Sequence, residues 1–186
     1  MVKIYIDQGH NPRDYNTGAE GNGFYEQDIT YEIGQLLYAL LRTNPKFDVR
    51  LSRENPDEIL GTSNSTSLVE RVREANAWGA DLFLSLHTNA AANTRASGSE
   101  ALIYSKASRT ALGVAEDILE ELNLTTGLRN RGVIERPGLY VLRKTNMPAV
   151  LVEMGFISNS YDAALMAYSP ELFAEGIYRG IVKYYS

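Results

Sequence analysis

Short apolar segments alternate with longer segments of helical periodicity along this chain, and no other feature constrains its fold as strongly. Segments rich in β-branched and aromatic residues, typical of buried strands, occupy 2–10, 47–52, 81–86, 100–105, 140–143 and 149–153. Apolar residues recur at helical spacing over 26–42, 67–78, 112–122 and 170–182. Strands separated by helices favour a mostly parallel sheet that is covered on both faces. We therefore predict an α/β fold.

Polar segments rich in glycine, proline and other small residues separate these elements, at 11–23, 53–66, 90–98 and 125–137. Asn44–Pro45 ends the first helical pattern, and Gly79 ends the second. Ser67–Glu70 has the spacing of a capping box, which predicts the start of the second helix. We assign Trp78 to core packing.

The size and composition of the chain exclude several classes of protein. With 186 residues, 44% of them hydrophobic, the chain can bury one core but is short for two, so we expect 1–186 to form a single domain. A net charge of -5 argues against a general nucleic-acid-binding protein. The absence of cysteine excludes disulfides and Cys-ligated zinc. The chain has no apolar run long enough to predict a membrane span. We also expect the protein to be a monomer.

Ionisable residues stand at the ends of three predicted strands. The only two histidines, His10 and His87, each end such a segment, and Glu153 ends the most apolar one. In open α/β sheets, ligands bind at the carboxyl ends of the strands. A simpler interpretation of Glu153 is a buried ion pair with a nearby arginine. Three such residues at one sheet edge favour a functional site instead.

Two imidazoles and one carboxylate form a ligand set that suits catalytic zinc, which keeps three protein ligands and one water. Glu26 is the preferred third ligand, because it begins a helix whose macrodipole favours an ionised carboxylate. Glu20 and Asp28 are alternatives for this role. Glu153 is then left to act as the base, because both histidines are used by the metal.

Two further groups of residues belong to this hypothesis. Asp7 precedes His10 closely enough to orient its ring from behind the metal ligands. Arg129, Arg131 and Arg136 lie in one predicted loop and could hold an anionic group of a substrate. Such arginines more often form a solvated surface.

Motifs spread over nearly the whole chain share one pattern. They are Asp7-Gln8-Gly9-His10, Gly18–Glu26, Leu51-Ser52-Arg53, Arg73-Glu74-Ala75-Asn76, Ser85–Ala90 and Met147–Asn159. Together they resemble the zinc-dependent N-acetylmuramoyl-L-alanine amidases of the type 3 family, the peptidoglycan hydrolases of bacterial autolysins and phage endolysins. Gln8 replaces the proline and Asn11 the glycine that are usual in the first motif.

The resemblance implies a twisted sheet of about six strands flanked by helices. It also implies that His10, Glu26 and His87 bind Zn²⁺, and that Glu153 handles the proton. The substrate would be peptidoglycan, cleaved at the amide between the lactyl group of N-acetylmuramic acid and the first L-alanine of the stem peptide.

Two other functions remain open at this point. One is a different zinc hydrolase, such as a carboxypeptidase or an amidase acting on another wall amide. The other is a catalytically silent wall-binding module, which the presence of Glu153 argues against. We expect the protein to act outside the cytoplasm, on the bacterial cell wall. Because the first residues lack the pattern of a signal peptide, the chain fits a phage endolysin released through a holin pore, and equally a catalytic domain of a secreted autolysin.

Overall fold

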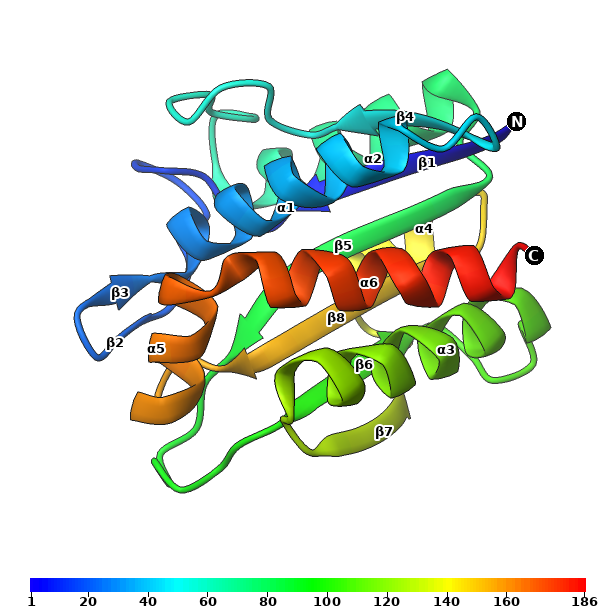
Figure 1. The fold of residues 1–186 in the computed structure, drawn as a ribbon. Helices are drawn as coiled ribbons and strands as arrows, with labels where there is room; N and C mark the ends of the chain where they lie inside the picture. Colours follow the sequence, from blue (N-terminus) through cyan, green and yellow to red (C-terminus); the bar gives the residue numbers. More distant parts are fainter.

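A six-stranded sheet runs through the centre of the computed structural model, which describes residues 1–186 (Figure 1). Its strands are β1 (Val2–Gln8), β4 (Phe47–Leu51), β5 (Leu82–Asn89), β6 (Ser99–Ile103), β7 (Asn130–Glu135) and β8 (Ala149–Phe156). They lie in the order β4-β1-β5-β8-β6-β7. Every neighbouring pair is parallel except β6 and β8, which are antiparallel. The predicted mostly parallel sheet is confirmed.

Helices cover both faces of this sheet, as predicted. One face packs against three long helices, α1 (Glu26–Arg42), α3 (Arg109–Thr126) and α6 (Pro170–Tyr184), which lie side by side in front of the strands in Figure 1. The opposite face carries α2 (Asn64–Trp78) and the short α4 (Tyr140–Lys144). A further helix, α5 (Ser160–Tyr168), follows β8. No helix is both long and apolar enough to cross a membrane.

The two faces of the sheet bury cores of different size. The core under α1, α3 and α6 contains 30 buried residues, whereas the core under α2 and α4 contains 10. Along β8, Val150 and Val152 face the larger core, and Ala149 and Leu151 face the smaller one. By this alternation Glu153 continues the face with the smaller core. Glu153 therefore lies on the side of the sheet that buries fewer residues.

Two segments have a different secondary structure from the one predicted. Residues 140–143, predicted as a strand, form the helix α4, in which the consecutive residues Val141 and Leu142 are both buried. Residues 130–135, predicted as part of a loop, form the edge strand β7 beside β6. Short apolar runs do not distinguish a strand from a helical turn, and an exposed edge strand can be polar, so neither pattern was decisive.

Helix α2 begins earlier than the predicted capping box. Its N-cap is Ser63, whose side chain accepts a hydrogen bond from the backbone N–H of Thr66. The predicted end is correct, because Gly79 adopts the left-handed conformation with φ 68°. The glycine-rich segment before α1 contains a short hairpin of β2 (Glu20–Gly21) and β3 (Phe24–Tyr25), which was not predicted.

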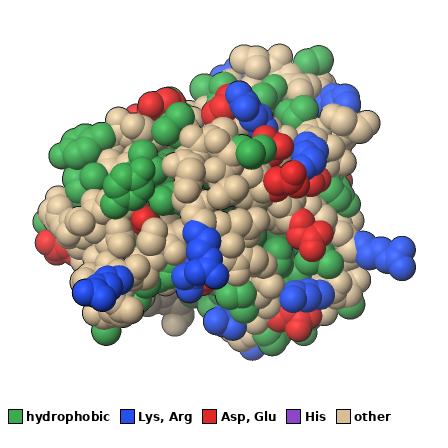
Figure 2. All heavy atoms as spheres, turned by 60° about the horizontal axis from the view of Figure 1, so that its bottom comes forward, with side chains coloured by type: hydrophobic (Ala, Val, Ile, Leu, Met, Phe, Trp, Pro, Cys, Tyr) green, Lys and Arg blue, Asp and Glu red, His purple; other side chains and the backbone are tan.

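Charged side chains of both signs are interspersed over the face of the molecule shown in Figure 2. The basic side chains on this face do not form one continuous patch. This distribution agrees with the acidic net charge of -5.

Candidate metal centre

His10 is separated from the end of β1 by Gly9 alone and has a left-handed backbone conformation, with φ 73°. Its ring lies edge-on to that of His87, with the centroids 4.8 Å apart. Gly9 allows this approach, because a Cβ atom there would lie 2.5 Å from both His87 Cε1 and the carbonyl oxygen of Leu86. The missing side chain at Gly9 therefore lets the ends of β1 and β5 bring the two imidazoles together.

Glu26 connects the two histidines. Its Oε2 atom lies 3.2 Å from His10 Nε2, and its Oε1 atom lies 3.1 Å from His87 Nδ1. The backbone N–H groups of Ala19 and Thr88 donate to Oε2 and Oε1, both at 2.8 Å. Glu26 is the first residue of α1, as predicted, and its side chain is buried.

The environment of Glu26 favours its ionised form. Burial alone would raise its pKa, but the hydrogen bonds and positive charge of His10 and His87 outweigh this effect and hold the pKa well below the usual range. Burial lowers the pKa of His87, and the nearby carboxylates of Glu26, Glu153 and Asp7 more than offset this, so the net shift is upward. Three carboxylates, those of Glu26, Glu153 and Asp7, therefore place negative charge around His87.

The donor set of this cluster fits a divalent metal ion. One ligand atom each from His10, Glu26 and His87 lies within 4.8 Å of the others. The Nδ1 atom of His10 lies 3.1 Å from the carbonyl oxygen of Asn16, and an N–H there would leave the Nε2 lone pair directed at the cluster. Two imidazoles and a carboxylate match the ligand preference of zinc. Neither alternative carboxylate, Glu20 or Asp28, belongs to the cluster.

Glu153 lies beside this cluster. It pairs with His87 in the register between β5 and β8, so both side chains lie on the same face of the sheet. Its Oε2 atom is buried and has no hydrogen-bond partner. Burial, together with the charges of Glu26 and Glu100, raises the pKa of Glu153 to about 7, although His87 acts in the opposite direction. The simpler interpretation as an ion pair with an arginine is wrong for this residue, because the arginine of this region, Arg131, binds Glu100.

Asp7 supports the site differently from the way predicted. Its carboxylate accepts hydrogen bonds from Arg71 Nη1 at 2.6 Å and Ser85 Oγ at 2.7 Å, and not from the His10 ring. Arg71 in turn donates to the backbone carbonyl oxygens of Gln8 and His10, at 2.6 and 2.7 Å. Asp7 therefore acts on the backbone of the His10 segment through Arg71.

The sequence patterns did not identify Arg71 as a site residue. Arg71 is fully buried, whereas Arg73, which belongs to the recognised helical motif, is exposed and pairs with Glu70. Both residues lie in α2, and only the packing of that helix against β1 determines which of them points inward. The available signal was that Arg71 lies on the same helical face as the apolar residues Leu68, Val72 and Ala75, which predicts that it points inward.

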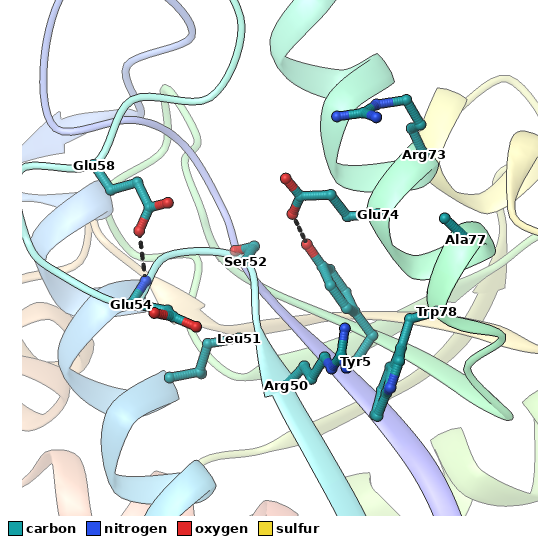
Figure 3. A pocket seen from close by; sticks show the side chains of 10 residues that line it. All are labelled: Tyr5, Arg50, Leu51, Ser52, Glu54, Glu58, Arg73, Glu74, Ala77 and Trp78. Carbon is teal, nitrogen blue, oxygen red and sulfur yellow. Dashed lines mark hydrogen bonds between the residues drawn. The ribbon is translucent and has the colours of Figure 1, made fainter.

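A surface cavity of about 590 Å³ lies elsewhere, between β4 and α2 (Figure 3). In it the Tyr5 hydroxyl donates to Glu74, and the guanidinium of Arg50 lies 4.7 Å from the centre of the Trp78 ring. None of the four predicted site residues lines this cavity. Trp78 is only partly buried and packs at the margin of the smaller core, so the predicted core position is correct only in part.

The fold and the site define a class of protein. A His–Glu–His cluster that could hold a metal ion, with a further carboxyl group beside it at the carboxyl edge of an α/β sheet, is typical of hydrolases. The profile of the Amidase_3 family, described as N-acetylmuramoyl-L-alanine amidase, matches residues 4–183. The chain belongs to this family.

Proteins similar to this chain come from bacteria and from a bacteriophage. The chain is 38% identical to the N-acetylmuramoyl-L-alanine amidase CwlM of Bacillus licheniformis over 97% of its length, and to the amidase LytC of Bacillus subtilis over 98%. It spans 66% and 35% of the lengths of these two proteins. An endolysin of Bacillus phage SPP1 is 34% identical over 97% of this chain and 65% of its own length.

Solved structures share the whole architecture. The catalytic domain of CwlV, an N-acetylmuramoyl-L-alanine amidase of Bacillus (Paenibacillus) polymyxa, is 30% identical and has a TM-score of 0.86, covering 100% of this chain and 98% of that domain. The amidase of Clostridium difficile 630 is 29% identical with a TM-score of 0.88, covering 99% and 96%.

Proposed function

We propose that this protein hydrolyses peptidoglycan at the amide between the lactyl group of N-acetylmuramic acid and the first L-alanine of the stem peptide. His10, Glu26 and His87 would hold a Zn²⁺ ion, and Glu153 would transfer the proton. The observation that carries this proposal is the position of the Glu153 carboxyl group beside the His–Glu–His cluster, with its Oε2 atom buried and without a hydrogen-bond partner. Membership of the amidase family supports the choice of bond.

The three cluster residues have the properties that a zinc site needs. Zinc, when bound, supplies a Lewis acid for the scissile carbonyl and lowers the pKa of water to near neutrality. Glu26 remains ionised because of its low pKa. The Asn16 carbonyl and the Thr88 N–H orient His10 and Glu26, so the ligands are held in place before the ion arrives.

Glu153 would serve as the proton carrier of the reaction. Its carboxylate takes a proton from the attacking water as the new C–O bond forms. It then gives that proton to the alanine nitrogen as the C–N bond breaks, leaving a lactyl carboxylic acid and a free amino group. A pKa of about 7 suits both steps, because the group can accept and release a proton near neutral pH.

The proposal extends to the setting of the enzyme. Residues 1–186 would form a monomeric catalytic domain that acts on the bacterial wall outside the cytoplasm. Both a secreted autolysin and a phage endolysin agree with the relatives, which include enzymes of bacteria and of a phage.

Product analysis on purified peptidoglycan tests the bond that is cleaved. We expect new amino termini on L-alanine, while the glycan strands stay intact. New termini on another stem residue would identify a carboxypeptidase or a different wall amidase instead. Binding to the wall without any new termini would identify a silent binding module.

A further inference from the structure

Arg131, at the start of β7, is held in place more firmly than its exposure suggests. Its Nε atom donates to Glu100 Oε2 at 2.9 Å, and its Nη1 atom donates to the carbonyl oxygen of Ser97 at 3.3 Å. Its guanidinium also lies 4.9 Å from the centre of the Phe156 ring. The Nη2 group makes no hydrogen bond within the protein, and 34% of the side chain is exposed. A fixed guanidinium therefore presents free donors to solvent.

The groups that hold Arg131 are themselves fixed by a buried carboxylate. Asp162, fully buried in α5, accepts hydrogen bonds from Ser97 Oγ at 2.7 Å and from the backbone N–H of Phe156 at 3.0 Å. Asp162 thereby joins the loop of Ser97, whose carbonyl oxygen accepts from Arg131, to the end of β8, where the Phe156 ring lies under the guanidinium. Gly98 adds space, since a Cβ atom there would lie 3.1 Å from Arg131 Cγ. This framework preorganises the guanidinium.

Arg131 lies in line with the candidate metal centre. His87 pairs with Glu153 across β5 and β8, and Glu153 pairs with Glu100 across β8 and β6, so the three side chains share one face of the sheet. Glu100 then contacts Arg131. Phe156, under the guanidinium, is three residues beyond Glu153 on the same strand. Arg131 thus extends the row of site residues toward β7.

The spacing matches a group on the peptide side of the substrate. Adjacent strands are about 4.8 Å apart, so the backbone of Arg131 lies roughly 10 Å from that of Glu153. An extended peptide covers about 3.5 Å per residue, so this distance corresponds to two or three residues. The lactyl carboxyl group on the sugar side is part of the scissile amide. A free carboxylate that Arg131 could bind would therefore belong to the peptide side.

We propose that Arg131 binds the α-carboxylate of the second stem-peptide residue, in stem peptides where the chain continues through that residue's side-chain carboxyl group and leaves the α-carboxylate free, and thereby determines which stem peptides are cleaved efficiently. This inference rests on the proposed function. The planar, cationic fork of an arginine guanidinium suits a carboxylate. Glu100 leaves the outer donors of Arg131 available, because its Oε1 atom accepts from Asn89 and its Oε2 atom accepts only from Arg131 Nε. It instead holds the guanidinium through Nε.

Two purified peptidoglycans that differ only at this carboxyl group provide the test, one with the free α-carboxylate and one with its primary amide. We expect the wild-type enzyme to release new alanine amino termini from the free-acid form with a kcat/KM about tenfold higher, mainly through KM. R131Q should bring the ratio close to one by losing activity on the free-acid form. R131K, which keeps the charge but not the fork, should give an intermediate ratio.

R136Q is the matched control, because Arg136 lies just beyond the opposite end of β7 and is exposed. It should keep the wild-type ratio. Equal wild-type cleavage of the two forms would overturn the inference without any variant, and so would an equal loss by R131Q on both forms. Wild-type enzyme that cleaves neither form would contradict the proposed function itself, which separates the two failures.

Discussion

Glu153 lies opposite His87 in the register between β5 and β8, with its Oε2 atom buried and without a hydrogen-bond partner. A carboxyl group in this position costs free energy, because burial opposes its ionisation. The cost is understandable if the group must exchange protons with a reacting molecule beside His87. A purely structural acid would have gained a partner.

Replacing Glu153 by glutamine should remove the proton carrier but not the zinc ligands. We expect E153Q to lose at least about a hundredfold in the release of alanine amino termini from peptidoglycan. Its zinc content, measured by elemental analysis, should equal that of the wild type. Undiminished hydrolysis by E153Q would rule out the proposed role of this residue.

Removing either imidazole should abolish zinc retention, because only two protein ligands would remain. We expect H10A and H87A to lose stoichiometric zinc after gel filtration. D28N is a matched control, since Asp28 lies in the first turn of the same helix as Glu26 but outside the cluster, and it should keep its zinc. Full zinc occupancy in H10A or H87A would refute the ligand assignment.

A methyl group at Gly9 should separate the two histidines. The Cβ atom of G9A would meet the His87 ring and the Leu86 carbonyl at 2.5 Å, so the backbone before His10 must move. We expect zinc affinity, measured by competition with a chelator, to fall by about 10- to 100-fold, as for other changes that misorient a ligand. G138A, where a Cβ atom would meet nothing within 4 Å, should bind zinc normally. Unchanged affinity in G9A would show that the close contact is unimportant.

The buried pair of Asp7 and Arg71 should make the fold sensitive to acid. Burial raises the pKa of Asp7, but Arg71 and the hydrogen bond from Ser85 outweigh it, so the pKa lies below its usual value. A lowered folded-state pKa means that the stabilisation is complete above the unfolded value of about 4 and is lost as the pH falls below it.

D7N should therefore lower the free energy of unfolding by about 3 to 5 kcal/mol at pH 7, since it leaves the Arg71 charge buried without its partner. The difference from the wild type should shrink at pH 3, as measured by urea denaturation. D57N is the control, because the Arg13–Asp57 pair is exposed, and it should change stability little at either pH. A D7N effect that does not depend on pH would contradict this account.

Local patterns in the sequence determined much of this protein. Periodicity identified the α/β class, placed Glu26 at the start of α1, and put His10 near the carboxyl end of β1, which ends two residues earlier than predicted, at Gln8. These features depend on residues near one another in the chain. The family motifs then indicated the residues to which we assign the proposed chemistry. Helix α4 and strand β7 could not be identified in this way, since their short segments take their conformation from the neighbours they pack against.

Only the tertiary structure decided how the site is assembled. Strand order and register set Glu153 between His87 and Glu100, and the packing of α2 turned Arg71 rather than Arg73 inward. These relationships join residues that are dozens of positions apart. They arise from backbone pairing and from the burial of helix faces, which no local spacing of residue types specifies.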